Sequence, residues 1–363
     1  MEITKIVITG GPCAGKTTAM SWVQNAFTQK GYRVLFVPET ATELINGGVA
    51  PWTCGTSTDF QRNLLSLQLV KEKVFEAAAR TMDAAKILIV CDRGTLDNKA
   101  YMNAPDFYRV VKELNTDEVT LRDSYDAVFH LVTAAKGAEE YYTTANNSAR
   151  TETPEQAAAA DDKLLSAWVG HPHFRVIDNS TGFEGKMRRL VSEISSFLGE
   201  PEQGEIKKKY LIGYPDVAAL EADPNCQRID IIQTYLKTAG GGEIRIRQRG
   251  FGGHFIYFAS VKKEVGGRKV EIERRLTSDE YLNLLMDADP EKRPIRKTRY
   301  CMTYGSQYFE IDVFPFWNDR AVLKVNLKSE DEALTLPDSI KVVKDVTWDD
   351  EYRNSAMARM GKT

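Results

Sequence analysis

The residues with the clearest chemical pattern lie at positions 10–17, where the sequence reads GGPCAGKT. This stretch matches the pattern G-x-x-x-x-G-K-[ST], and it lies between an apolar run, KIVIT (5–9), and a helical pattern that ends near Phe27. In such a loop, backbone N–H groups surround phosphate oxygens, the lysine neutralises the β- and γ-phosphates, and the threonine hydroxyl ligates Mg²⁺. The pattern predicts a site for ATP or GTP with Mg²⁺, formed by Gly10, Gly11, Pro12, Cys13, Ala14, Gly15, Lys16, Thr17 and Thr18.

Charged residues follow three other apolar runs, where a parallel sheet places its chemistry. Asp92 and Arg93 come after ILIV (87–90), Glu39 comes after VLFV (34–37), and Asp178 ends FRVID (174–178). We expect Asp92 to hold Mg²⁺ through water or to accept a proton from a substrate hydroxyl. Arg93 would steady the transferring phosphoryl group, and Glu39 would bind a hydroxyl of an acceptor. The alternative is that these residues cap helices or form surface ion pairs.

A polar stretch at 136–154 has no apolar periodicity. One interpretation is a lid over the phosphates, from which Arg150 would contact the γ-phosphate as a catalytic residue. The other is an ordinary surface loop in which Thr151 or Thr153 caps the next helix.

The secondary-structure pattern that must position these residues changes near residue 200 from mixed helices and strands to strands. Before it, five β-rich runs alternate with helical patterns, which predicts a parallel sheet covered by helices. After a Gly- and Pro-containing segment at 199–204, eight alternating segments separated by turns predict an antiparallel sheet or barrel. We therefore expect an α/β domain over 1–200 and a β-barrel domain over 205–363.

Charged residues in the second half recur at every second position. Arg245, Arg247 and Arg249 share one face of a strand, and the same spacing relates Lys207 to Lys209, Glu271 to Glu273 and Glu310 to Asp312. If the sheet closes, these side chains line its interior, which would suit a polyanion because Arg matches phosphate geometry. The alternative is that the charged faces point to solvent.

Composition limits the class of protein. The 363 residues are 42% hydrophobic and 27% charged with a net charge of −3, which excludes a wholly disordered chain and gives no indication of nucleic-acid binding. No apolar run approaches the ~18 residues of a membrane span. No secretory signal is visible, and the cysteine count of five argues against a disulfide framework, so we expect a cytoplasmic protein.

The first 200 residues resemble the AAA_28 family of P-loop ATPases, which is similar to nicotinamide riboside kinases and deoxynucleoside kinases. The phosphate loop, VPET (37–40), CDRG (91–94) and NNSART (146–151) carry the resemblance. It implies Asp92 as the catalytic base and Arg93 and Arg150 as phosphate clamps.

Segments from 205 to 359 resemble the CYTH fold of triphosphate tunnel enzymes, among them EIKKKYLI (205–212), EIRIRQRG (243–250) and YFEIDVF (308–314). The resemblance implies that polyphosphate binds Lys209, Arg245, Arg247, Arg249, Lys262 and Arg299, and that metal binds Glu205, Glu310 and Asp312. The chain departs from the family where three expected carboxylates are replaced by Lys207, Lys324 and Asn326. Because a protonated lysine cannot ligate a hard cation, these changes predict poor metal-dependent catalysis in the tunnel.

Three functions follow as hypotheses. The first is an ATP- and Mg²⁺-dependent phosphotransferase or NTPase that acts on a small nucleoside-like or phosphorylated acceptor, with a second domain that binds polyphosphate. The second is a triphosphatase or pyrophosphatase that works in the tunnel. The third is a switch in which nucleotide binding controls ligand capture without significant turnover.

Overall fold

The computed structural model describes residues 1–142, 153–200, 206–238, 242–265, 268–305, 307–327 and 332–359. Arg150 and Glu205 lie outside these ranges, so their predicted roles stay predictions. Contacts divide the chain into two compact units, Met1–Ile194 and Ser195–Thr363.

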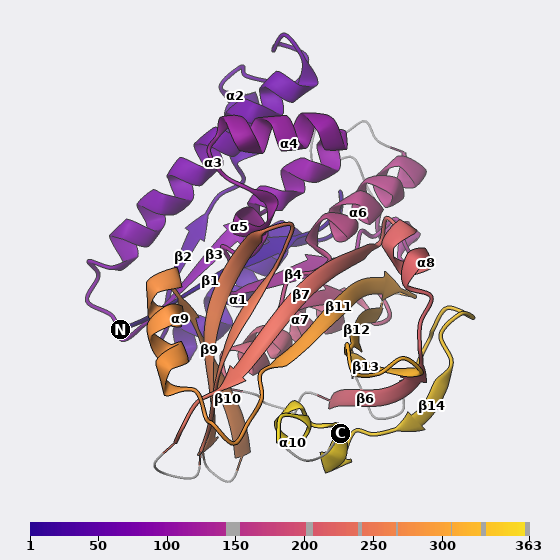
Figure 1. The fold of residues 1–363 in the computed structure, drawn as a ribbon. Coiled ribbons are helices and arrows are strands. Elements are labelled where there is room, and N and C mark those ends of the chain that lie inside the picture. The colour runs from indigo at the N-terminus through magenta and orange to yellow at the C-terminus, as the bar shows by residue number, and fades with distance from the viewer. Residues whose placement is uncertain are drawn as a thin grey trace. The chain divides into compact units, whose positions relative to one another are not determined.

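The first unit is built on a five-stranded parallel sheet (Figure 1). Its order is β2-β3-β1-β4-β5, formed by β1 (Glu2–Thr9), β2 (Arg33–Val37), β3 (Lys86–Asp92), β4 (Ala127–Leu131) and β5 (Phe174–Ile177). The three middle strands, β3, β1 and β4, are buried along most of their length and contain runs of apolar residues, which is typical of a parallel sheet covered on both faces. The predicted α/β fold is confirmed.

Helices connect these strands: α1 (Lys16–Gln29), α2 (Thr40–Asn46), α3 (Ser57–Ala79), α4 (Ala104–Glu113), α5 (Glu118–Arg122), α6 (Pro154–Trp168) and α7 (Phe183–Phe197). A 3₁₀ helix, Thr95–Tyr101, follows β3. Helix α6 begins with a capping box between Thr153 and Gln156, so Thr153 has the capping role that the surface-loop interpretation gave it.

Strand register brings the ends of β1 and β3 together. Ile8 of β1 pairs with Asp92 of β3, and the N–H of Arg93 donates to the carbonyl of Ile8 at 3.1 Å. The phosphate loop leaves β1 two residues later. Parallel pairing therefore puts Asp92 and Arg93 beside that loop, although more than 70 residues separate them in sequence.

The second unit contains a nine-stranded antiparallel sheet (Figure 1). Its order is β10-β9-β8-β7-β11-β12-β13-β6-β14. The strands are β6 (Ile206–Gly213), β7 (Cys226–Tyr235), β8 (Glu243–Phe251), β9 (His254–Val265), β10 (Arg268–Leu276), β11 (Ile295–Tyr304), β12 (Gln307–Val313), β13 (Arg320–Leu327) and β14 (Val342–Asp345). Short helices α8 (Val217–Ala222), α9 (Ser278–Leu284) and α10 (Asn354–Met357) accompany it.

This sheet has an apolar face and a charged face. On β8, Ile246 is fully buried in a cluster with Leu276 and with Tyr281 of α9. On the opposite face, Lys207 and Lys262 are exposed. Several other charged residues of that face are enclosed, since Arg249, Arg299 and Asp312 are 4%, 8% and 0% exposed. The structure thus favours the charged interior over the solvated alternative, because a solvent-facing strand would leave these side chains exposed.

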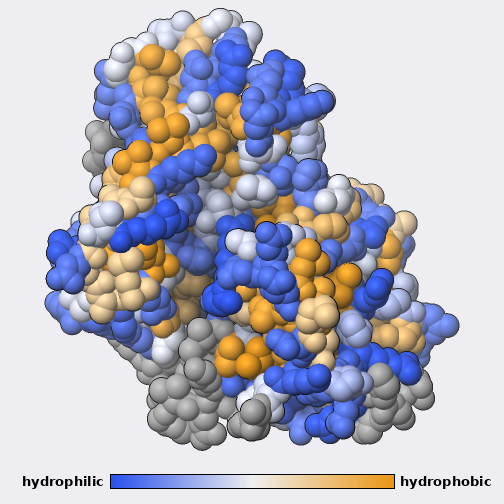
Figure 2. All heavy atoms as spheres, turned by 60° about the vertical axis from the view of Figure 1, so that its left-hand side comes forward, coloured by the Kyte–Doolittle hydropathy of each residue, from blue (hydrophilic) through white to orange (hydrophobic). Residues whose placement is uncertain are grey.

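The surface drawn in Figure 2 is mixed, with several hydrophobic areas separated by hydrophilic residues. Single exposed apolar side chains are normal on a soluble surface. Within the part of the chain that the structure describes, no helix is both long and apolar enough to cross a membrane.

Candidate active site and cation-lined cavity

The phosphate loop adopts the backbone conformation that its glycines permit. Gly10 and Gly15 have φ values of 144° and 90°, and a Cβ on Gly10 would collide with the carbonyl of Leu131. Gly15 directly precedes α1 and makes no side-chain cap, so the first N–H groups of α1 can face a ligand. A loop of this kind at a helix start is a binding site for phosphate.

Lys16 lies folded over the loop. Its Nζ donates to the carbonyls of Gly10 and Gly11 at 3.2 and 3.4 Å, and the residue is only 9% exposed. Burial, reinforced by the positive charge of Arg93, lowers the pKa of Lys16 to about 8. An arriving phosphate would offset this burial, because it supplies the negative charge that the ammonium lacks.

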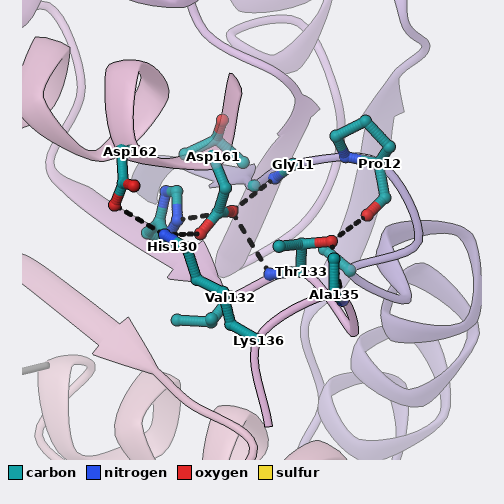
Figure 3. Close-up of polar contacts among 12 residues, drawn as sticks. Gly11, Pro12, His130, Val132, Thr133, Ala135, Lys136, Asp161 and Asp162 are labelled. Carbon is teal, nitrogen blue, oxygen red and sulfur yellow. Dashed lines mark hydrogen bonds and ion pairs between the residues drawn. The ribbon is translucent and has the colours of Figure 1, made fainter. Parts of the chain in front are cut away.

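Asp161 of α6 contacts both the phosphate loop and the segment that follows β4 (Figure 3). Its Oδ1 accepts from the N–H of Gly11 at 2.8 Å and from that of Thr133 at 3.2 Å, and its Oδ2 lies 3.1 Å from Lys136 Nζ. His130 Nε2 is 3.0 Å from Oδ1. Asp161 was not predicted from the sequence, since one aspartate in a polar helix 150 positions from the loop gives no local signal.

Lys186 of α7 holds the other side of the loop and was not predicted either. Its Nζ donates to the carbonyls of Ala14 and Val132 at 3.1 and 2.6 Å. Burial lowers the pKa of this lysine to about 8. Asp161 and Lys186 thus fix one N–H and one carbonyl of the loop from two different helices.

Arg93 and Glu39 form an ion pair at the ends of β3 and β2. Arg93 Nε donates to Glu39 Oε1 at 2.5 Å, and Arg93 Nη1 lies 3.6 Å from Asp97 Oδ2. Arg93 has a φ of 68°, an uncommon conformation for a side chain other than glycine, asparagine or aspartate, and such strain is frequent at functional sites. Burial alone would raise the pKa of Glu39, but the charges of Arg93 and Lys16 lower it to about 2.

Asp92 belongs to the same cluster of charged residues. Its Oδ1 is buried and has no hydrogen-bond partner among the described residues. Burial raises the pKa of Asp92, opposed by the nearby Lys16. Together with the Thr17 hydroxyl, this carboxylate offers the hard oxygen donors that Mg²⁺ takes, so the residues present fit the ion.

Asp178, the acidic residue that ends the fifth apolar run, has an ordinary structural environment. Its Oδ1 accepts from Ser180 and lies 2.9 Å from Arg189 Nη1. This matches the alternative interpretation of a turn residue in an ion pair. Asp97 was not predicted as a site residue. Its carboxylate accepts hydrogen bonds from Thr9 Oγ1 and Trp168 Nε1 at 2.7 and 2.6 Å.

The second unit contains a cavity of about 210 Å³ lined by cations. Its lining residues are Lys209, Tyr235, Arg245, Lys262, Lys324, Arg353, Asn354 and Ser355. Lys209, Arg245 and Lys262 were predicted to bind substrate, whereas Arg353 and its two neighbours were not. Arg247 contacts Glu273, and neither it nor Arg249 or Arg299 is among the residues that line this cavity.

Next to the cavity, cations surround the carboxylates predicted to bind metal. Asp312 Oδ2 lies 2.7 Å from both Lys297 Nζ and Lys324 Nζ, and Arg299 Nε donates to Asp312 Oδ1 at 2.7 Å. Arg299 Nη1 also lies 2.6 Å from Glu310 Oε2. Among the residues that the structure describes, no group of three or more His, Cys, Asp or Glu is placed to hold a metal ion.

Residues 5–186, half of the chain, match the family model AAA_28, described as an AAA domain. The chain belongs to this family. No curated protein matches it.

Two solved structures of NE1496 are similar to the chain, one described as a hypothetical protein and one as an inorganic triphosphatase. They are 30% and 28% identical, with TM-scores of 0.32 and 0.31, over 43% of this chain and 97% and 95% of theirs. A third similar structure is PH1012 from Pyrococcus horikoshii OT3, 14% identical over 35% of this chain and 80% of that one, with a TM-score of 0.26.

Proposed function

We propose that the N-terminal unit is an ATP- or GTP- and Mg²⁺-dependent phosphotransferase or nucleotide hydrolase, with a small hydroxyl-bearing, nucleoside-like molecule as the preferred acceptor. The observation that carries the proposal is the buried Oδ1 of Asp92, which lacks a hydrogen-bond partner among the described residues beside the phosphate-loop lysine. A buried carboxylate with a raised pKa next to a phosphate loop suits a general base.

The groups of the site then divide the tasks of phosphoryl transfer among them. Mg²⁺, when bound, neutralises charge on the phosphates, with Thr17 and Asp92 as its protein donors. The loop amides and Lys16 bind the β- and γ-phosphates. Asp92 Oδ1 takes the proton of the acceptor hydroxyl, or of water, as that oxygen bonds to the γ-phosphorus and the bond to the β–γ bridging oxygen breaks. Arg93, oriented by Glu39, stabilises the charge of the transferring group.

The experiment measures phosphate release and acceptor phosphorylation by the full chain with Mg²⁺ and ATP, GTP or inorganic triphosphate. We expect Lys16→Ala to abolish nucleotide turnover, whereas Lys112→Ala, an exposed lysine of α4, leaves it unchanged. Undiminished turnover in Lys16→Ala would refute the assignment.

A second function is favoured by the cavity of the C-terminal unit. Its lining contains five cationic side chains and no carboxylate, which suits a polyphosphate ligand. NE1496 is described as an inorganic triphosphatase, so a triphosphatase in the cavity is the competing assignment. It predicts that Arg353→Gln abolishes hydrolysis of inorganic triphosphate while Lys16→Ala does not.

If nucleotide binding controls capture in the cavity, the two affinities must be coupled. ATP would then change the affinity for polyphosphate by the same factor as polyphosphate changes the affinity for ATP. Calorimetric titration of each ligand in the absence and presence of the other tests this switch.

A further inference from the structure

The family resemblance implies that the C-terminal unit binds a divalent metal ion. The side chains that the structure places beside its cavity disagree with this expectation. Three positions where that resemblance expects carboxylates hold Lys207, Lys324 and Asn326. Lys324 replaces an expected metal ligand and also brings a positive charge to the position of the metal ion. Its ammonium lies 2.7 Å from Asp312 Oδ2, where a bound cation would have to sit.

The carboxylate of Asp312 is already surrounded by three cationic side chains. It is fully buried and accepts four hydrogen bonds, from Lys297 Nζ, from Lys324 Nζ and two from Arg299. Three of these donors lie on Oδ2 and one on Oδ1, so three cations already surround the carboxylate and offset its charge. Glu310, its neighbour on the same face of β12, is paired with Arg299. The carboxylates that the structure describes here therefore do not fit a divalent cation, since cations already occupy their surroundings.

Positive charge in the cavity exceeds what these carboxylates offset. Lys209 and Lys324 stand directly opposite each other in the β6–β13 ladder, an arrangement of like charges that is unfavourable unless an anion lies between them. Arg245 and Arg353 add two guanidinium groups from other parts of the unit, of which Arg353 is also paired with the exposed Asp350 at 2.9 Å. Lys262 is paired with Glu243 at 2.7 Å and contributes less.

Neutral donors complete the lining. Tyr235, Asn354 and Ser355 bring a phenol, an amide and a hydroxyl to the same space of about 210 Å³. Burial and the nearby Lys324 and Arg353 lower the pKa of Lys209 to about 8, although the negative charge of Asp312 opposes this shift. Such a lining fits a compact molecule that carries several negative charges.

We propose that this cavity captures a linear polyphosphate through its own lysines and arginines, without a divalent metal ion, and does not hydrolyse it. The inference rests on the proposed polyphosphate function of the cavity and adds that Lys324 takes the place of the metal. Hydrolysis is not expected, because no carboxylate of the Asp312–Glu310 pair is available to activate water.

The test is isothermal titration of the full chain with inorganic triphosphate, first in EDTA and then in excess Mg²⁺. All proteins carry Lys16→Ala, which removes binding at the phosphate loop. Lys324→Gln and Arg353→Gln alter two independent parts of the lining, and exposed Lys341→Gln is the matched control. Arg353 is half exposed, so its variant keeps the test valid if Lys324→Gln fails to fold.

We expect binding in EDTA that is no weaker than in Mg²⁺, at least about tenfold weaker in each cavity variant and unchanged in the control. Phosphate release from the same samples should stay at background. Triphosphate binding only with Mg²⁺, or phosphate release that the cavity variants abolish, would overturn the inference of metal-free binding without hydrolysis. Polyphosphate would remain the ligand. Binding in neither buffer, or binding insensitive to both variants, would overturn the proposed function of the cavity as well.

Discussion

Asp161 offers the sharpest test of how the phosphate loop is held. The substitution Asp161→Ala removes the acceptor of the Gly11 and Thr133 N–H groups, which lie 2.8 and 3.2 Å from Oδ1 (Figure 3). Asp161→Asn keeps the shape and one acceptor oxygen but removes the charge that faces Lys136. The two variants therefore separate hydrogen bonding from charge.

The magnitude follows from burial. Asp161 is 0% exposed, and each buried amide left without an acceptor costs about 1–3 kcal/mol, so two cost about 2–6 kcal/mol. This is a large part of the ~5–15 kcal/mol that stabilises a domain. Because part of the loss falls on the loop conformation that binds phosphate, we expect the Kd for MgATP to rise at least about tenfold, equivalent to ~1.4 kcal/mol.

The assay combines urea unfolding, titration with MgATP and hydrogen exchange of the loop amides. Asp162→Asn is the matched control, since its side chain is 68% exposed and contacts Lys136 at the surface, a pair worth at most about 1 kcal/mol. We expect Asp161→Ala to lose most, Asp161→Asn less, and Asp162→Asn almost nothing. Equal MgATP affinity and loop exchange in Asp161→Ala and Asp162→Asn would refute the reasoning.

Acid pH gives the same test a second readout. Burial alone would raise the pKa of Asp161, but His130, Lys136 and the Gly11 amide outweigh it and hold that pKa well below its usual range. A depressed native pKa contributes stability above the unfolded value of about 3.9, and this stability is lost as the pH falls through the native value. The stability advantage of the wild type over Asp161→Asn should therefore shrink below about pH 4.

Three further predictions concern the two sites. Asp92→Asn should lower kcat by about 10²–10⁴-fold and also raise the KM for MgATP, because the variant loses both the proton acceptor and a donor to Mg²⁺; because burial raises the pKa of Asp92, wild-type turnover should fall as the pH drops through that raised value, and a pH–rate profile of the variant should lack this acid limb. Gly10→Ala should abolish MgATP binding in a calorimetric titration, since its Cβ would meet the Leu131 carbonyl at a φ of 144°, whereas Gly182→Ala, with nothing within 4 Å of its Cβ, should bind normally. Triphosphate affinity in EDTA should decline as the pH rises past about 8, where Lys209 loses its proton, and a pH-independent affinity would contradict its role.

The sequence predicted the features that depend on local spacing. The phosphate loop is visible because glycine, lysine and threonine must occur at fixed offsets between a strand and a helix. The two sheets are visible because a buried parallel strand is a continuous apolar run, while an antiparallel strand alternates with a period of two. The same period of two is enough to predict that Arg245, Arg247 and Arg249 share one face of their strand.

The tertiary structure decided which distant residues act on these elements. Asp161 and Lys186 reach the loop from helices more than 140 residues away, and Arg353 enters the cavity from the last segment of the chain. The pairing of Asp312 with Lys297, Arg299 and Lys324 depends on the register of three strands. Sequence spacing sets which side of a strand a residue occupies, but only the register and packing of the folded chain set what that residue meets there.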